Sequence, residues 1–252
     1  MPIKEINYMR EVAEESLQEA DAPVKDSVKE DNSIKAEFSE SEFNEDISIT
    51  DHDLISFQKT LQSLRDCVLP DEAVANAIHK ACEFFGIPEV PIIEADGACV
   101  WTDDTSLADD LFGFNRDQLM DMGISGEDSL TLVYTHECAH RCLKDTFIDS
   151  WTEELACDYF SGIHAGLNNI NLDNFEASLG CTEGGNSHPA GALRIQFIEH
   201  GRHTATDLIE HNSEVTFENC MTRFNQFLIE KQGLITEYRN IVEDRLSSIS
   251  SN

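Results

Sequence analysis

The stretch Thr135–Leu143, with the sequence THECAHRCL, is the part of the chain that decides its fold and its chemistry. It contains His136, Glu137 and His140 in the pattern H-E-x-x-H. Residues four apart on a helix lie one above the other, so His136 and His140 can offer two imidazoles to one metal ion. Glu137 is placed about a third of a turn round the helix, within reach of a water at that ion. We therefore predict a metal site on this helix.

The neighbours of the two histidines indicate that the site faces inward. At about 100° per residue, four apolar side chains flank the histidines: Leu132, Val133, Ala139 and Leu143. Imidazoles that face the interior need polar partners. The alternative, two histidines and a glutamate on a solvated surface, requires a polar face that the sequence does not provide here.

The charge and the composition limit the classes of protein to which this chain can belong. The chain has 252 residues, enough for one sizeable domain, and a formal net charge of −32. This charge disfavours binding to nucleic acids and to anionic membranes, because both surfaces are negative. It favours a basic protein or peptide as partner, although solubility alone also explains it. No apolar run approaches the roughly 18 to 20 residues of a membrane span, so we predict no membrane insertion.

The N-terminal region differs from the rest of the chain. Residues 1–50 carry 14 acidic and five basic residues, a composition that does not bury a core, and we predict a disordered acidic tail. The first residues lack the apolar segment of a secretory signal. The eight cysteines show no compact disulfide spacing, so we expect reduced thiols in a cytoplasmic protein.

Residues 51–252 are expected to form one domain, whose upstream part is 51–123. Apolar periodicity predicts helices over 53–67 and 71–85, the second with Asp71 as N-cap and Gly86 as terminator. The dipeptide Asp96-Gly97 lies between two apolar runs, 90–95 and 98–101, and indicates a type I′ turn joining two antiparallel strands. Residues 107–115 fit either a strand or a loop, and a short helix over 116–122 follows.

The central part, 124–200, is expected to hold the metal site. The motif helix should run from about residue 125 to 143, and a second helix from 151 to 167. A short helix over 172–179 and a helix from Pro189 to residue 199, closed by Gly201, complete this part. The last part, 201–252, is predicted to be one long or broken helix from about residue 216.

The second helix supplies candidates for a third ligand. Catalytic zinc usually takes three protein ligands and keeps one open position. Glu154 and Asp158 are four apart, in the pattern E-x-x-x-D that begins 14 positions after His140. Together with H-E-x-x-H this resembles the gluzincin metallopeptidases, the thermolysin-like group. The resemblance implies that Glu154 is the third zinc ligand and that Asp158 holds the second ring nitrogen of His136. Glu153 is the rival ligand on the same helix.

A further segment adds two candidate site residues. Ser187-His188-Pro189 followed by Arg194-Ile195 is similar to the H-P…R-I segment of membrane metallopeptidases related to prenyl-protein proteases, which have a far longer gap before their glutamate. His188 is a candidate for substrate or oxyanion binding, with helix capping as the alternative. Arg194 is expected to pair with Asp158 or with a substrate carboxylate. Tyr159 and His164 are further candidate transition-state donors, with packing as the alternative.

Two cysteines within the motif are excluded as ligands. Around the helix axis, Cys138 lies about 180° and Cys142 about 140° from the mean direction of the two histidines. One helix therefore does not direct both cysteines and both histidines at the same ion. Cys157 is likewise assigned to core packing.

These patterns lead to one expectation. We predict a helix-rich α+β, zincin-like domain with a small antiparallel sheet, whose edge strand receives an extended peptide. It would bind one Zn²⁺ through His136, His140 and Glu154, with Glu137 as general base for hydrolysis of peptide bonds, and we favour cleavage within a chain over cleavage at its end. The alternative is an inactive zincin-like scaffold that binds a basic partner.

Overall fold

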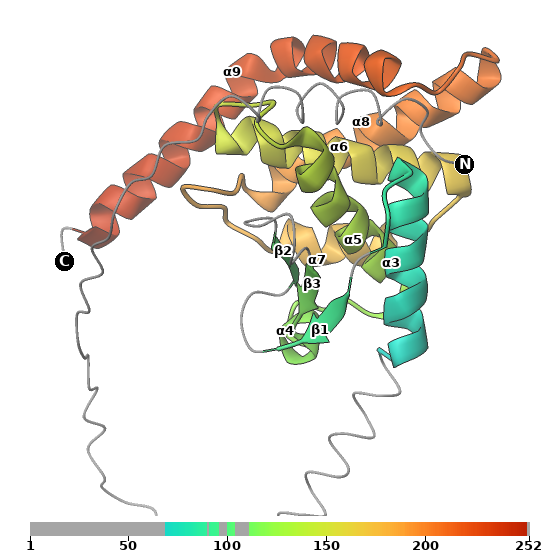
Figure 1. The fold of residues 1–252 in the computed structure, drawn as a ribbon. Helices are drawn as coiled ribbons and strands as arrows, with labels where there is room; N and C mark the ends of the chain where they lie inside the picture. The colour runs from blue at the N-terminus through green and yellow to red at the C-terminus, as the bar shows by residue number, and fades with distance from the viewer. Residues whose placement is uncertain (1–68, 90, 96–99, 104–110, 251–252) are drawn as a thin grey trace, which may run out of the picture.

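The computed structural model describes residues 69–89, 91–95, 100–103 and 111–250. The predicted tail and the helix expected over 53–67 therefore lie outside the described residues. Within them the fold is mostly α (Figure 1). The helices are α3 (Asp71–Phe85), α4 (Arg116–Asp121), α5 (Gly126–Leu143), α6 (Ser150–Asn168), α7 (Asp173–Gly180), α8 (Gly191–Glu210) and α9 (Phe217–Ser250).

The predicted α+β class and antiparallel sheet are wrong. The small sheet has the order β1-β3-β2, and β1 (Ile92–Glu94) pairs with β3 (Leu111–Phe114) in parallel. β2 (Val100–Asp103) pairs with the other side of β3 in the antiparallel sense. The two runs expected to form a hairpin are thus separated by β3. β3 is mostly buried whereas β1 is exposed, so the more apolar strand takes the central position. The Asp96-Gly97 turn lies outside the described residues.

Helix α3 forms where its sequence pattern predicts. Its buried side chains recur at helical spacing, and Gly86 ends it in the left-handed region, with φ of 67°. Asp71 is its first residue and Pro70 precedes it as N-cap, so Asp71 is not the cap. A buried arginine at the start of α4, Arg116, donates to Asp71 at 2.6 Å and to Glu94 of β1 at 3.2 Å. This ion-paired side chain joins α3, α4 and the sheet.

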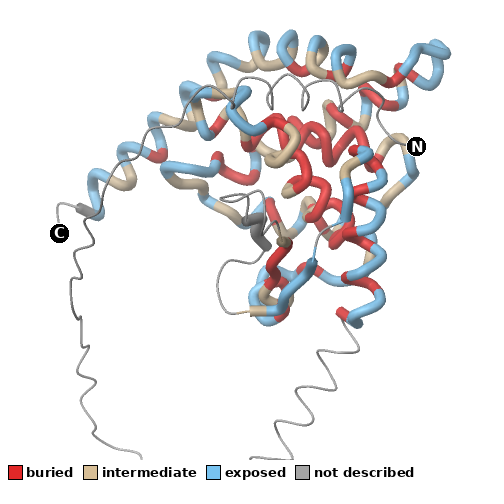
Figure 2. Tube along the Cα trace, in the orientation of Figure 1, coloured by how far each residue is buried: buried red, intermediate tan, exposed pale blue. Residues whose placement is uncertain are grey.

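Helices α5, α6 and α8 build the centre of the molecule. α5 packs between α3 and α6, and α6 packs along most of its length against α8. Figure 2 shows buried residues concentrated on these central helices, while α9 is largely exposed. α6 and α8 approach closely because glycines face each other's backbone. A Cβ on Gly162 would lie 1.9 Å from the Ile198 oxygen, and one on Gly201 would lie 2.0 Å from the Tyr159 oxygen.

This close approach corrects the predicted bounds of α8. The helix begins at Gly191, not at Pro189, and continues through Gly201 to Glu210. Gly201 lies inside the helix, where its lack of a side chain allows the close contact with α6. It does not end the helix. The last helix, α9, crosses the body as one long element (Figure 1). Among the described residues no helix is both long and apolar enough to cross a membrane.

Candidate metal centre

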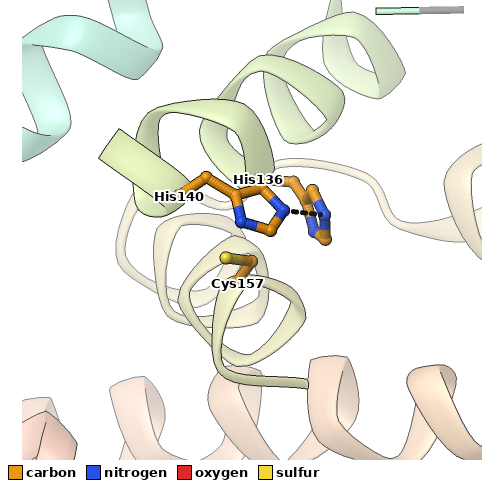
Figure 3. Close-up of side chains that lie close together, drawn as sticks. All are labelled: His136, His140 and Cys157. Carbon is orange, nitrogen blue, oxygen red and sulfur yellow. Dashed lines mark hydrogen bonds between the residues drawn. The ribbon is translucent and has the colours of Figure 1, made fainter. Parts of the chain in front are cut away.

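Helix α5 places the two motif histidines side by side, one turn apart. Their ring centroids are 4.8 Å apart, and the two Nε2 atoms face each other at 3.2 Å (Figure 3). His136 is buried, with 7% of its surface exposed, whereas His140 is half-buried. Because α5 carries buried apolar side chains around His136, the predicted inward orientation of the pair is present.

Helix α6 brings Glu154 to the same two nitrogens. Glu154 Oε2 lies 3.2 Å from His136 Nε2, and Glu154 Oε1 lies 3.3 Å from His140 Nε2. The carboxylate is buried, and its Oε2 accepts no hydrogen bond from any residue that the structure describes. Two imidazole nitrogens and two carboxylate oxygens therefore converge on one point, the position where the sequence predicts the metal.

The outer nitrogens of the rings are held by two further carboxylates. Asp158 Oδ1 lies 3.0 Å from His136 Nδ1, although the ring N–H does not point straight at it. Glu153 Oε1 lies 2.8 Å from His140 Nδ1. If each Nδ1 carries a proton toward its carboxylate, each Nε2 carries a lone pair. Glu153 thus stands behind His140 rather than at the convergence point.

The electrostatics of this centre are negative. Four carboxylates, those of Glu137, Glu153, Glu154 and Asp158, surround the histidines. Burial opposes protonation of His136, but Asp158 and Glu154 outweigh it and raise its pKa to about 10. Burial also opposes the ionisation of Glu154, yet its two histidine partners and Arg194 hold its pKa well below the usual range. Such a cluster attracts a divalent cation.

Arg194 is the counter-charge of this centre. Its Nε donates to Asp158 Oδ2 at 2.7 Å and its Nη2 to Asp158 Oδ1 at 2.8 Å, a bidentate pair. Its Nη2 is also 3.7 Å from Glu154 Oε2. Of the two roles predicted for Arg194, the structure has the pairing with Asp158. Arg194 consequently orients Asp158, which holds His136, and it also approaches Glu154 directly.

The thiol of Cys157 also lies at the centre, and sequence reasoning missed it. The structure groups one ligand atom each of His136, His140 and Cys157 within 4.8 Å. In Figure 3 the sulfur lies beneath the His140 ring, away from the line that joins the two Nε2 atoms. Burial raises the pKa of the Cys157 thiol well above its usual value. One feature of the sequence indicated this position: Cys157 directly precedes Asp158, and adjacent residues of a helix lie near the same site.

Beside the histidines lies a cleft of about 330 Å³. One wall is polar and includes His136, Glu137 and Arg194, and burial raises the pKa of Glu137 above its usual value. The other wall is apolar and contains Met122, Ile124, Val133, Phe175 and Leu179. Glu137 thus has access to the space next to the convergence point.

His188 reaches this cleft from the loop between α7 and α8. Its Nε2 lies 3.3 Å from Glu154 Oε1, and the side chain is 58% exposed. Because α8 begins only at Gly191 with Ala190 as its N-cap, His188 is not the capping residue. The loop thus places His188 at the same Glu154 oxygen that His140 Nε2 approaches.

The His188 loop, residues 181–190, is held by two distant elements. Trp151 of α6 donates its indole N–H to the Gly185 oxygen at 3.0 Å, and Gly185 N–H donates to the His188 oxygen at 2.7 Å. Arg245 of α9 donates to the Gly184 oxygen at 2.5 Å and to Glu183 Oε2 at 2.6 Å. Sequence reasoning missed these contacts, because no pattern links α9 to a loop some 60 residues earlier.

The other predicted candidates lie elsewhere. Tyr159 is fully buried and its ring packs against Phe224 of α9, so it is not a donor in the cleft. His164 stacks on Phe84 and does not line the cleft. Cys138 is fully buried, as the exclusion of the motif cysteines from the metal predicted.

Comparison with known proteins adds nothing to this geometry, since no family model, curated protein or solved structure matches the chain.

Proposed function

We propose that this protein is a zinc-dependent hydrolase of peptide bonds, related in mechanism to the gluzincins that its H-E-x-x-H and E-x-x-x-D patterns resemble. One observation carries the proposal: the Nε2 atoms of His136 and His140 lie 3.2 Å apart, and each lies 3.2 to 3.3 Å from one oxygen of the buried Glu154 carboxylate. Once the imidazoles release their Nε2 protons, these atoms offer their lone pairs to one cation.

The donor set fits zinc. Two imidazoles and one carboxylate are a known set for catalytic zinc, and each ligand here has a carboxylate or guanidinium behind it. A bound zinc ion supplies Lewis-acid polarisation of a carbonyl and acidification of water. The proposed ligands are His136, His140 and Glu154.

The chain's own residues supply the rest of the reaction. Glu137 takes the proton of the attacking water and delivers it to the leaving amine. Its raised pKa, caused by burial, suits a group that must both accept and release a proton. His188, which lines the cleft beside Glu154, donates a hydrogen bond to the oxygen on which negative charge develops. The apolar wall receives an apolar side chain of the peptide.

Cys157 favours a second candidate. If the metal takes His136, His140, Cys157 and Glu154 together, the site has four protein ligands and no open position, which is typical of a structural zinc. The protein would then be an inactive scaffold that binds a basic partner, in keeping with its net charge of −32. The two Nε2 atoms converge on Glu154 and not on the Cys157 sulfur, which favours a site with three ligands and one open position.

The deciding experiment combines metal content with peptide turnover. The full chain, purified without added zinc, is expected to carry one zinc ion and to cleave peptides from a mixed library. Glu137→Gln should keep the zinc and lose activity by about 10² to 10⁴-fold, because it removes the base but no ligand. Glu127→Gln, in the first turn of the same helix, is the matched control and should stay active. Full activity of Glu137→Gln would overturn the mechanism, whereas stoichiometric zinc without any cleavage would favour the scaffold.

A further inference from the structure

The apolar wall of the cleft is built from three separate pieces of the chain. Two of its residues, Met122 and Ile124, lie in the connection between α4 and α5. Val133 lies on α5, and Phe175 and Leu179 lie on α7. The connection is short, and α7 has only eight residues. The shape of the wall therefore depends on the contacts that join these pieces to one another.

One side chain, that of Asn174, joins all three pieces. Asn174 belongs to α7, and its Oδ1 accepts the backbone N–H of Ser125 at 3.0 Å. Its Nδ2 donates to the Gly123 oxygen at 2.7 Å. The hydroxyl of Ser129, a buried residue of α5, donates to the same Oδ1 at 2.5 Å. Both polar atoms of the amide are thus used in contacts between elements.

Each of these contacts lies beside a residue of the wall. Gly123 stands between the two wall residues of the connection. Ser129 is four residues before Val133, so the two share a face of α5. Asn174 itself directly precedes Phe175. A change in the contacts of Asn174 consequently moves the residues that form the wall.

The amide of Asn174 has one orientation and one role. An N–H faces its Oδ1 and a carbonyl faces its Nδ2, so exchanging the two atoms would bring like groups together. Asn at the start of a helix often caps it, but the N-cap of α7 is Leu172. The Ser125 side chain makes no cap hydrogen bond for α5 either. Asn174 therefore serves the junction between the elements.

We propose that Asn174 is the positioning residue of the apolar wall and that it sets the preference of the cleft for a large apolar side chain of the peptide. This inference rests on the proposed function, because the preference distinguishes peptide substrates. Asn174 does not line the cleft itself, so it acts through the wall residues next to its contacts, Ile124, Val133 and Phe175.

The effect of Asn174 differs between large and small side chains. A large apolar side chain gains from the wall where many of its atoms are in contact with it, whereas alanine makes few such contacts. Loosening the wall therefore lowers the preference for the large side chain. A loss of stability, in contrast, reduces the active fraction equally for both substrates and leaves their ratio unchanged. The ratio thus separates positioning from a merely structural role.

Two peptides test the proposal on the full chain with its zinc bound. They differ in one residue beside the cleaved bond, which is phenylalanine in one and alanine in the other. The parent is expected to prefer phenylalanine about tenfold or more in kcat/KM. Asn174→Ala should reduce this preference at least about fivefold, whatever loss the two peptides share, because it removes all three contacts. Its zinc content should equal that of the parent.

Two further variants calibrate this result. Ser129→Ala removes only the hydroxyl contact and should reduce the preference about twofold. The matched control is Asn76→Ala. Asn76 of α3 donates its amide to Glu127 Oε2 of α5 at 3.3 Å, so it also joins two elements, but it does not line the cleft. This control should keep the preference of the parent.

An unchanged preference in Asn174→Ala overturns the proposal, and so does an equal loss of preference in Asn76→Ala. If Asn174→Ala does not fold, Ser129→Ala decides, and a preference equal to that of the parent then overturns it.

A measurement without catalysis separates this proposal from the hydrolase proposal. N-acetylphenylalaninamide is added to the full chain while the methyl signals of Met122 and Leu179 are followed by NMR. The signals should shift saturably in the parent, and Asn174→Ala should bind the probe at least about fivefold more weakly. This difference without any peptide cleavage by the parent would overturn the hydrolase and retain the role of Asn174. Peptide cleavage with equal binding of the probe would overturn the role of Asn174 alone.

Discussion

The buried histidines His136, at the metal centre, and His164, on α6, hold the same side chain in opposite electrostatic settings. His136 lies among carboxylates, which raise its pKa to about 10, whereas burial lowers the pKa of His164 to about 3. The two rings are connected through one turn of α5, because Thr135, which fixes the tautomer of His164, precedes His136 directly. At neutral pH His136 therefore has to release a proton when it binds a metal, whereas His164 is already a neutral imidazole.

The difference determines what each ring can do. At His136 the facing atoms are a second imidazole nitrogen and a carboxylate oxygen, a donor set that suits a metal cation once the imidazole protons are released. At His164 the Nδ1 atom bonds to Thr135 and the ring stacks on Phe84, so this imidazole belongs to the packing of α3, α5 and α6. Partner groups, and not the residue type, set the chemistry of each histidine.

The largest expected effect concerns the ligands of the metal centre. Glu154→Gln removes the carboxylate shared by the two Nε2 atoms and should weaken zinc, measured by competition with a chelator, by more than about 100-fold. Glu153→Gln, the matched control on the same helix, leaves an oxygen behind His140 Nδ1 and should cost about tenfold at most.

Cys157→Ala completes that series. An open site with three ligands predicts nearly unchanged zinc affinity for this variant, because the sulfur is not at the Nε2 convergence. A larger loss in Cys157→Ala than in Glu154→Gln would establish the His-His-Cys set and contradict the hydrolase proposal.

Local patterns predicted the helices that carry the metal centre. α3, α5 and α6 begin and end within about two residues of their predicted bounds, because caps and apolar periodicity act within a few residues. The position of Glu154 beside the histidines agrees with what the resemblance to the gluzincins implies, whereas helix spacing alone left Glu153 as a rival.

The remainder depends on contacts that no local pattern records. Gly201 resembles a helix terminator until α6 is seen against it, and the antiparallel hairpin was wrong because β3 intervenes between β1 and β2. The tautomer of His164 depends on Thr135, 29 residues earlier in the chain. Such pairings are set by tertiary packing.

A smaller effect is expected from the helix that holds the His188 loop. Arg245→Met removes the contacts of α9 to Glu183 and Gly184 but keeps the apolar stem of the side chain. Since His188 would be less well positioned, kcat of peptide cleavage should fall about tenfold while zinc affinity stays unchanged. Arg223→Met, which removes a contact of α9 to Asp207 of α8, is the control and should leave kcat unchanged. Equal losses in both variants would indicate general destabilisation instead of positioning.

The smallest effect separates the two histidine settings by pH. The folded state keeps His164 neutral down to a pKa of about 3, whereas the unfolded chain protonates it near 6.5. The unfolded state therefore binds the extra proton between these values, and stability falls as the pH is lowered, by up to about 1.4 kcal/mol per pH unit. His164→Phe removes this contribution, so its free energy of unfolding, measured by urea titration from pH 7 to 4.5, should fall less steeply than that of the parent. Parallel curves would mean that His164 is protonated in the folded protein over this pH range.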